Sequence, residues 1–210
     1  MTLSSPAHDT LIDALAESGY AIADTVLSPD EVTALAAEAL RLSRDGALKP
    51  AAIGRQASVQ LDPTLRGDAI RWLDESQASP AQQAYFRVMH GIREACNREL
   101  YLNLVELETH FAVYPPGGRY TKHLDQFHRS GARKISSILY LNRDWQAPYG
   151  GQLRIYLEGE QPEPYLDVDP IGGRLVLFDA SRFYHEVLPA TQPRLSLTGW
   201  FRMRADHPLT

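Results

Sequence analysis

The sequence has only one cysteine, Cys96, and no cluster of basic residues. A single cysteine excludes an internal disulfide and a cysteine-based zinc site, and its helical surroundings favour a buried apolar role. The 26 acidic and 21 basic residues are dispersed, and no run of lysine or arginine could neutralise a phosphate backbone. We therefore expect a protein of a reducing compartment with no nucleic-acid partner.

Long apolar runs are absent as well. No stretch approaches the roughly 20 apolar residues of a transmembrane helix, and the first twenty residues lack the basic start and apolar run of a secretion signal. We expect a cytoplasmic protein with no membrane partner. The 210 residues, 44% of them hydrophobic, contain no internal repeat and predict a single domain over residues 1–210. No pattern indicates the oligomeric state.

Residues 1–103 predict mainly helical support for the rest of the chain. An apolar stripe near the N-terminus stops at Gly19, a residue type that ends helices, and a short strand is expected over residues 21–27. Two further helices are expected to begin at capping signals with proline at the first helical position, the first of them ending near Gly46. These signals are Ser28-Pro29-Asp30-Glu31 and Ser79-Pro80-Ala81-Gln82.

The segment between the second and third helices has no regular pattern. We predict that residues 49–63 form a mobile substrate loop, since long irregular connections in compact domains are commonly functional. A disordered insertion without function is the alternative interpretation.

Residues 104–203 have a different texture, with short runs of valine, isoleucine, leucine and tyrosine between turn signals. Six or seven strands at this spacing predict a mainly β fold, a sandwich or barrel, with the N-terminal helices packed on one sheet. The turn signals are Pro115-Pro116-Gly117-Gly118, Gly150-Gly151, residues 162–164 and Gly172-Gly173.

Three residues of this β half are candidate metal ligands. His123 and Asp125 are two apart at an expected strand or its end, so both side chains point to one face, and His185 opens another strand that could supply a third ligand. Two imidazoles and one carboxylate leave coordination positions open, as in non-haem Fe(II) enzymes that activate dioxygen. Zinc-dependent hydrolysis is a second chemistry that this set supports.

The strand from Arg194 to Met203 predicts a binding site for a carboxylate. Arg194, Ser196, Thr198 and Trp200 alternate onto one face, and the opposite face is apolar. The planar guanidinium of Arg194 matches a carboxylate in two parallel hydrogen bonds, and the Thr198 hydroxyl could add another. Taken alone, Arg194 could equally form a surface salt bridge.

The order of these residues resembles the 2-oxoglutarate and Fe(II)-dependent dioxygenases, which fold as a double-stranded β-helix, a jelly-roll variant. Within them, the chain is similar to the prolyl 4-hydroxylases of the hypoxia-sensing type and their bacterial relatives over about residues 50–203. The motifs that carry the likeness are Arg66-Gly67-Asp68, Tyr114-Pro115, Tyr120-Thr121-Lys122-His123-Leu124-Asp125, Ile138-Leu139-Tyr140-Leu141-Asn142, Gly150-Gly151-Gln152-Leu153, His185-Glu186-Val187 and Trp200-Phe201.

The resemblance implies a role for each matching residue. It makes His123, Asp125 and His185 the iron ligands, and assigns the distal carboxylate of 2-oxoglutarate to Arg194, Tyr140 and Thr198. It places Tyr114 and Trp200 beside the metal. It also implies that Asp68 and Arg133 pair with each other and support the substrate loop, whereas their ordinary interpretation is an exposed ion pair of little energetic value.

The chain departs from the animal enzymes in two segments. It has one residue fewer between Tyr114 and Tyr120, and residues 126–131 replace a loop rich in asparagine, aspartate and glycine. Both segments are expected near the substrate entrance, so they affect substrate identity more than chemistry.

The implied activity is hydroxylation of a prolyl residue in a protein or peptide, with Fe(II), 2-oxoglutarate and O2, and ascorbate as a candidate reductant. 2-Oxoglutarate is decarboxylated to succinate and CO2, and the carboxylate of Asp125 favours hydroxylation over halogenation. The compact length resembles the bacterial enzymes, which point to a translation factor such as elongation factor Tu. Animal enzymes point instead to a hypoxia-inducible transcription factor.

Two other classes of function compete with this interpretation. An oxygenase for a free amino acid or other small metabolite would share the metal and oxoacid site and lack any peptide dependence. A non-catalytic jelly-roll module with a structural metal would tolerate the loss of Arg194.

Overall fold

Strands from both halves of the chain form two antiparallel sheets. The computed structural model describes residues 6–52, 62, 64–126 and 132–204. The strands of the larger sheet are β1 (Tyr20–Ala23), β2 (Lys49–Pro50), β3 (Ala69–Trp72), β4 (Leu104–Tyr114), β6 (Arg133–Tyr140), β9 (Leu175–Asp179) and β11 (Arg194–Met203). Those of the smaller sheet are β5 (Tyr120–His123), β7 (Leu153–Tyr156), β8 (Tyr165–Val168) and β10 (His185–Val187).

The two sheets form a sandwich whose interior holds one of two apolar cores. The larger sheet has the order β1-β9-β6-β11-β4-β3-β2 and the smaller one β5-β10-β7-β8. Leu153 and Ile155 of the smaller sheet pack with Ile138 and Val176 of the larger sheet, and all four are buried. The predicted double-stranded β-helix is thus confirmed, and its interior is where the candidate ligands were expected.

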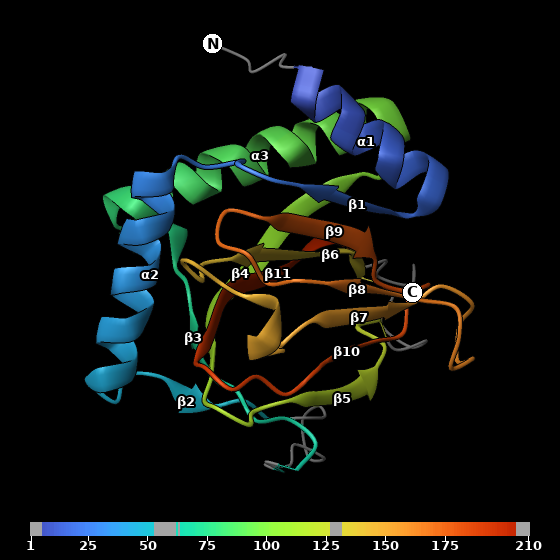
Figure 1. Cartoon of the computed structure of the whole chain (residues 1–210). Coiled ribbons are helices and arrows are strands. Elements are labelled where there is room, and N and C mark those ends of the chain that lie inside the picture. Colours follow the sequence, from blue (N-terminus) through green and yellow to red (C-terminus); the bar gives the residue numbers. More distant parts are fainter. Residues whose placement is uncertain (1–5, 53–61, 63, 127–131, 205–210) are drawn as a thin grey trace, which may run out of the picture.

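Three helices cover the outer face of the larger sheet (Figure 1). They are α1 (Pro6–Ser18), α2 (Pro29–Arg44) and α3 (Pro80–Leu100), and two single-turn 3-10 helices lie at Glu75–Gln77 and Ala147–Tyr149. Ser28 and Ser79 cap α2 and α3 as their sequence signals predict. Gly19 follows α1 with φ of 79°, a conformation that glycine adopts at little cost.

Strand β11 contributes side chains both to the second core, which lies between the larger sheet and the helices, and to the interior of the sandwich. Its odd-numbered side chains Leu195, Leu197 and Phe201 pack against the helices. Arg194, Thr198 and Trp200 instead line the cavity between the sheets, as the period-two alternation predicts. A single strand therefore anchors the helical layer and supplies one wall of the site.

The N-terminal half contributes more than helical support, which corrects the predicted division of the chain. Strands β1, β2 and β3 extend the larger sheet, with β3 paired to β4 and β2 paired to β3. Lys49–Pro50 is therefore a short strand rather than the start of a loop, because its backbone pairs with the free edge of β3. Most of the predicted substrate loop, residues 53–61 and 63, lies outside the described residues.

Two smaller observations complete the fold. The predicted strand over residues 21–27 ends at Ala23, because Thr25 has a positive φ of 60° that leaves the extended conformation. In the part of the chain that the structure describes, no helix is both long enough and apolar enough to span a bilayer.

Candidate metal and oxoacid site

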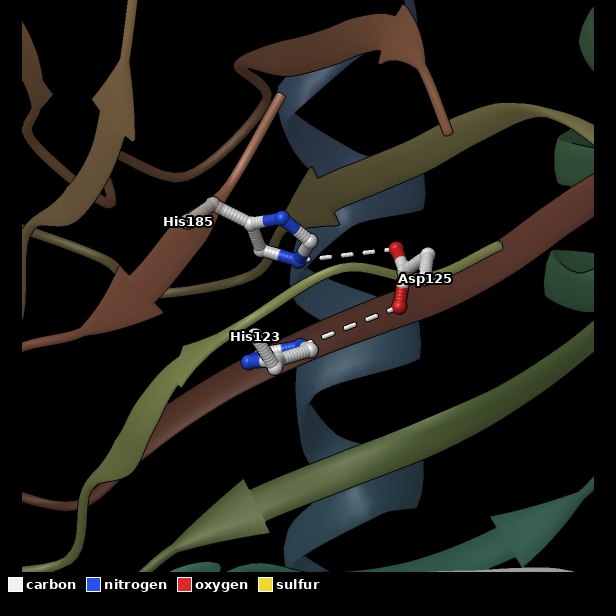
Figure 2. Close-up of side chains that lie close together, drawn as sticks. All are labelled: His123, Asp125 and His185. Atoms are coloured by element: carbon white, nitrogen blue, oxygen red, sulfur yellow. Dashed lines mark ion pairs between the residues drawn. The ribbon is translucent and has the colours of Figure 1, made fainter. Parts of the chain in front are cut away.

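Neighbouring strands of the smaller sheet position the three candidate metal ligands (Figure 2). His123 is the last residue of β5, Asp125 follows two residues later, and His185 is the first residue of β10. His185 lies directly opposite His123 in the antiparallel pairing of these strands. His185 thus meets His123 and Asp125, some 60 residues earlier in the sequence, in the interior of the sandwich.

The three side chains converge on one point. One ligand atom from each of His123, Asp125 and His185 lies within 4.8 Å of the others. The Nε2 atoms of His123 and His185 lie 3.7 Å and 3.5 Å from separate carboxylate oxygens of Asp125. No other group of three such side chains that could hold a metal occurs among the described residues.

Backbone contacts orient both imidazoles toward this point. Nδ1 of His123 hydrogen-bonds the carbonyl of Thr121 at 2.7 Å, and Nδ1 of His185 hydrogen-bonds the carbonyl of Phe183 at 3.0 Å. Each contact leaves Nε2 as the free, ligating nitrogen. The ring of Tyr120 stacks on His123 at a centroid distance of 3.6 Å, which restricts its rotation.

The electrostatic surroundings keep Asp125 ionised. Burial acts to raise the pKa of this carboxyl, but His185, His123 and a hydrogen bond from Ser136 together lower it to about 2. Ser136 Oγ donates to Asp125 Oδ2 at 2.6 Å. Burial and the neighbouring His185 lower the pKa of His123 to about 3, so its ring is neutral. A carboxylate and a neutral imidazole are the protonation states that bind metal.

This donor set fits Fe(II). Two imidazoles and one carboxylate on one side of an ion leave open positions for a chelating co-substrate and for dioxygen. Within the described part of the chain, no cysteine or third histidine joins the cluster as a fourth ligand to close it as a structural zinc site would. The geometry therefore agrees with the expected ligands.

A second polar group lies deeper in the same interior. Arg194 is 1% exposed, and its Nε donates to the carbonyl of Gly151 at 2.8 Å. Its Nη2 and the hydroxyl of Tyr140 are buried without a hydrogen-bond partner among the described residues. Burial raises the pKa of Tyr140, so this hydroxyl stays protonated and can donate. Two buried donors without an acceptor fit the carboxylate of a bound oxoacid.

The structure also brings the remaining predicted site residues to the cavity. Tyr114, Thr198 and Trp200 line it together with the ligands. The ring of Tyr114 lies 5.2 Å from the Arg194 guanidinium, and burial raises the pKa of its phenol far above the usual value. Trp200 helps to lower the pKa of Asp125, and its buried indole nitrogen has no hydrogen-bond partner among the described residues.

The expected pairing of Asp68 with Arg133 is wrong in this structure. Both oxygens of Asp68 accept from Arg66, at 2.7 Å and 3.0 Å. Arg133 instead donates to Glu108 at 2.6 Å, and its guanidinium lies 3.5 Å from the centre of the Trp200 ring. Arg66 is only two residues from Asp68 in the chain, which makes it the nearer partner of that carboxylate. Glu108 lies opposite Trp200 in the sheet, and the guanidinium of Arg133 lies over the ring of Trp200, so Glu108 is the nearer partner of Arg133.

Three residues that sequence reasoning did not select contribute to the site. Ser136 holds Asp125, His110 lines the cavity, and Arg66 lies over the Tyr120 ring at 4.7 Å. Alternation back from Tyr140 would have placed Ser136 on the cavity face.

Comparison with known proteins agrees with this geometry. The family described as the 2OG-Fe(II) oxygenase superfamily matches residues 109–202. A prolyl-4-hydroxylase structure from Pseudomonas putida is similar with 43% identity and a TM-score of 0.83, over 94% of this chain and 100% of that chain. A Trichoplax adhaerens prolyl hydroxylase, solved with a hypoxia-inducible factor peptide fragment, shares 26% identity and a TM-score of 0.82, over 93% and 88% of the two chains.

A human relative, Egl nine homolog 1, is 33% identical over 145 residues, which cover 65% of this chain and 33% of that protein. The chain spans about a third of the length of the curated relatives that it matches. The matched residues include the ligand cluster and Arg194, and the similarity to the bacterial structure extends over the helices as well. The chain belongs to the 2OG-Fe(II) oxygenase superfamily, as a dioxygenase of the prolyl 4-hydroxylase type.

Proposed function

We propose that the protein hydroxylates a prolyl residue of a protein or peptide, using Fe(II), 2-oxoglutarate and O2. One observation carries this proposal. The cluster of His123, Asp125 and His185 lines the same cavity as Arg194, whose Nη2 is unpartnered. The ring of Tyr140, whose hydroxyl is also unpartnered, has its centre 5.0 Å from the Arg194 guanidinium. The arrangement suits a metal and an anionic chelator that are bound together. We also infer that residues 1–210 act as a single dioxygenase domain.

In this proposal the chain's own residues hold and orient the reactants. His123, Asp125 and His185 would hold the iron, while Arg194, Tyr140 and Thr198 would bind the far carboxylate of 2-oxoglutarate. Bound Fe(II) and 2-oxoglutarate supply the oxidative decarboxylation and the oxidation of an unactivated carbon. Burial of the ligands in the sandwich excludes bulk water from the reacting atoms.

The oxoacid part of the proposal is tested by Tyr140→Phe, which removes only the unpartnered hydroxyl. The affinity of the Mn(II)-loaded protein for 2-oxoglutarate should fall about tenfold, which corresponds to one lost charge-assisted hydrogen bond. The melting temperature should stay the same or rise, because a buried unsatisfied group is removed. Unchanged affinity in isothermal titration calorimetry would remove Tyr140 from the site.

A protein substrate is favoured over a metabolite by the relatives. The Trichoplax adhaerens enzyme was solved with a peptide fragment, and the Pseudomonas putida structure is a prolyl-4-hydroxylase. We propose a translation factor such as elongation factor Tu as the first candidate, because the bacterial structure is 43% identical to this chain, whereas the animal relatives are 26% to 33% identical.

Mass spectrometry tests the substrate class. Candidate proteins and host extract are incubated with the enzyme, Fe(II), 2-oxoglutarate and ascorbate, with His185→Ala as the inactive control. A gain of one oxygen on a proline with the active enzyme alone supports the proposal. If peptides stay unmodified and a small-molecule fraction stimulates 2-oxoglutarate turnover, the metabolite oxygenase replaces it. If no oxoacid is consumed at all, the non-catalytic module is favoured.

A further inference from the structure

His110 is a buried imidazole in the cavity whose two nitrogens have no hydrogen-bond partner among the described residues. Its side chain lines the cavity and is 1% exposed. Burial, together with the positive charges of Arg66 and Arg133, lowers its pKa to about 3. The ring is therefore neutral near physiological pH and has one N–H donor and one acceptor.

Two tryptophans close His110 off from solvent. The Trp72 ring packs edge-on against it at a centroid distance of 4.7 Å, and the Trp200 ring lies at 5.6 Å. Trp72 is itself 49% exposed, so it forms the outer cover. An unpaired buried polar group costs about 1–3 kcal/mol, and the indole rings that flank this imidazole accept no conventional hydrogen bond. The partner must come from the cavity.

The register of the larger sheet places His110 on the wall that the proposed function gives to the co-substrate. His110 of β4 lies directly opposite Thr198 of β11, and Tyr114 lies opposite Arg194. His110 and Tyr114 of β4, and Arg194, Thr198 and Trp200 of β11, all line the cavity, as the period-two alternation of a strand allows. His110 and the candidate ligand Asp125 line the same cavity, and so does Trp200, whose ring lies beside His110.

A 2-oxo acid buried in this cavity would need hydrogen-bond donors for the oxygens at both of its ends. Arg194 and Tyr140 provide unpartnered donors for the far carboxylate, and His110 lies opposite Thr198 and beside Trp200 on the same wall. A neutral N–H in a cavity that the positively charged Arg66 also lines suits an anionic oxygen.

We propose that His110 is a further co-substrate-binding residue, whose N–H donates a hydrogen bond to an oxygen of the bound 2-oxo acid. This inference rests on the proposed function and adds a residue to its oxoacid site. Because the bond forms only when the oxoacid is bound, His110 lowers the stability of the empty protein and raises its affinity for the ligand.

The test measures 2-oxoglutarate affinity in the Mn(II)-loaded protein, in which no turnover occurs. His110→Leu should weaken binding about tenfold, whereas His110→Gln, which keeps a donor and an acceptor, should stay within about threefold of the parent. His110→Met provides a second apolar variant should leucine disturb the strand. The metal-free His110→Leu protein should melt at the same or a higher temperature than the parent, which a merely structural histidine would not produce.

Thr109→Val is the matched control on the same strand. The Thr109 hydroxyl faces the helices and contacts the Tyr85 hydroxyl at 3.0 Å, so its loss should lower the melting temperature and leave oxoacid affinity unchanged. Equal binding by the parent and both apolar variants would overturn the inference and indicate that water alone satisfies the ring. Equal losses in the leucine and glutamine variants would overturn it too. A parent that binds no 2-oxoglutarate contradicts the proposed function itself.

Discussion

At the scale of single residues, the metal ligands depend on neighbours that do not touch the metal. The carbonyls of Thr121 and Phe183 fix the two imidazoles, and the Ser136 hydroxyl fixes Asp125. Such contacts set the orientation and the protonation state of a ligand, and their loss commonly reduces metal affinity by about 10–100-fold.

Ser136→Ala tests this dependence directly. The variant leaves one oxygen of a buried carboxylate without its 2.6 Å hydrogen bond, so Mn(II) affinity should fall at least about tenfold. Ser137→Ala is the matched control, because the Ser137 hydroxyl contacts the carbonyl of Gly199 instead. Calorimetric titration of both variants measures the difference, and equal affinities would show that Ser136 does not support the ligand.

At the scale of structural elements, the turn before β7 holds the arginine at the start of β11. Gly151 has φ of +71°, and its carbonyl accepts the Arg194 Nε hydrogen bond. A Cβ at this position would lie 2.9 Å from the Ala190 side chain and 3.3 Å from Arg194 Cδ. The turn can approach Arg194 this closely only because residue 151 has no side chain.

Gly151→Ala should therefore destabilise the protein by about 1–2 kcal/mol and also weaken 2-oxoglutarate binding. Gly159→Ala is the control, because Gly159 has a similar φ of +61° and no atom near the added Cβ. It should reduce stability alone. The comparison needs urea denaturation and oxoacid titration of both variants, and normal oxoacid affinity in Gly151→Ala would contradict the role of the turn.

The connection from β9 to β10 depends on a charged residue. Asp179 accepts hydrogen bonds from the Ser181 backbone and hydroxyl and pairs with Lys134 at 3.2 Å. Burial acts to raise the pKa of Asp179, but the Ser181 and Lys134 contacts hold it below its ordinary value of 3.8. This connection leads directly to the ligand His185.

A carboxylate whose pKa is lower in the folded state stabilises the protein at pH values above its unfolded-state pKa. This stability is lost as the pH falls through the folded-state pKa. Asp179→Asn should reduce the free energy of unfolding by about 1 kcal/mol near neutral pH and by progressively less below about pH 4. Urea denaturation across this range measures the difference. A deficit that stays constant down to about pH 3 would contradict the assignment.

At the scale of the whole molecule, the sequence predicts local and periodic features well. The caps of α2 and α3 are encoded in four consecutive residues, and alternation along β11 identifies which of its side chains enter the cavity. Strands β2 and β3 were missed because two and four residues are too short to show a period. The choice of side-chain partner was harder still, since the Arg133–Glu108 pair depends on how β4 and β6 are placed in the sheet, and Asp68 pairs with its near neighbour Arg66 instead.

The unpredicted site residues have the same explanation. His110 gains significance only once it is known to lie opposite Thr198 and beneath Trp72. Ser136 becomes relevant once Asp125, just beyond β5, is brought against β6. Residue types and spacing therefore indicated the chemistry, whereas the supporting contacts required the three-dimensional arrangement.

The central claim is that one cavity couples 2-oxoglutarate decarboxylation to proline hydroxylation. The most direct measurement follows labelled CO2 released from 2-oxoglutarate labelled at C1, together with oxygen gained by a proline-containing protein substrate. The parent and Asp45→Ala, which removes an exposed carboxylate at the end of α2, should release CO2 and hydroxylate proline in equal amounts when Fe(II) is present. Asp125→Ala should do neither. CO2 release by Asp125→Ala, or CO2 release by the parent in the absence of Fe(II), would contradict the account.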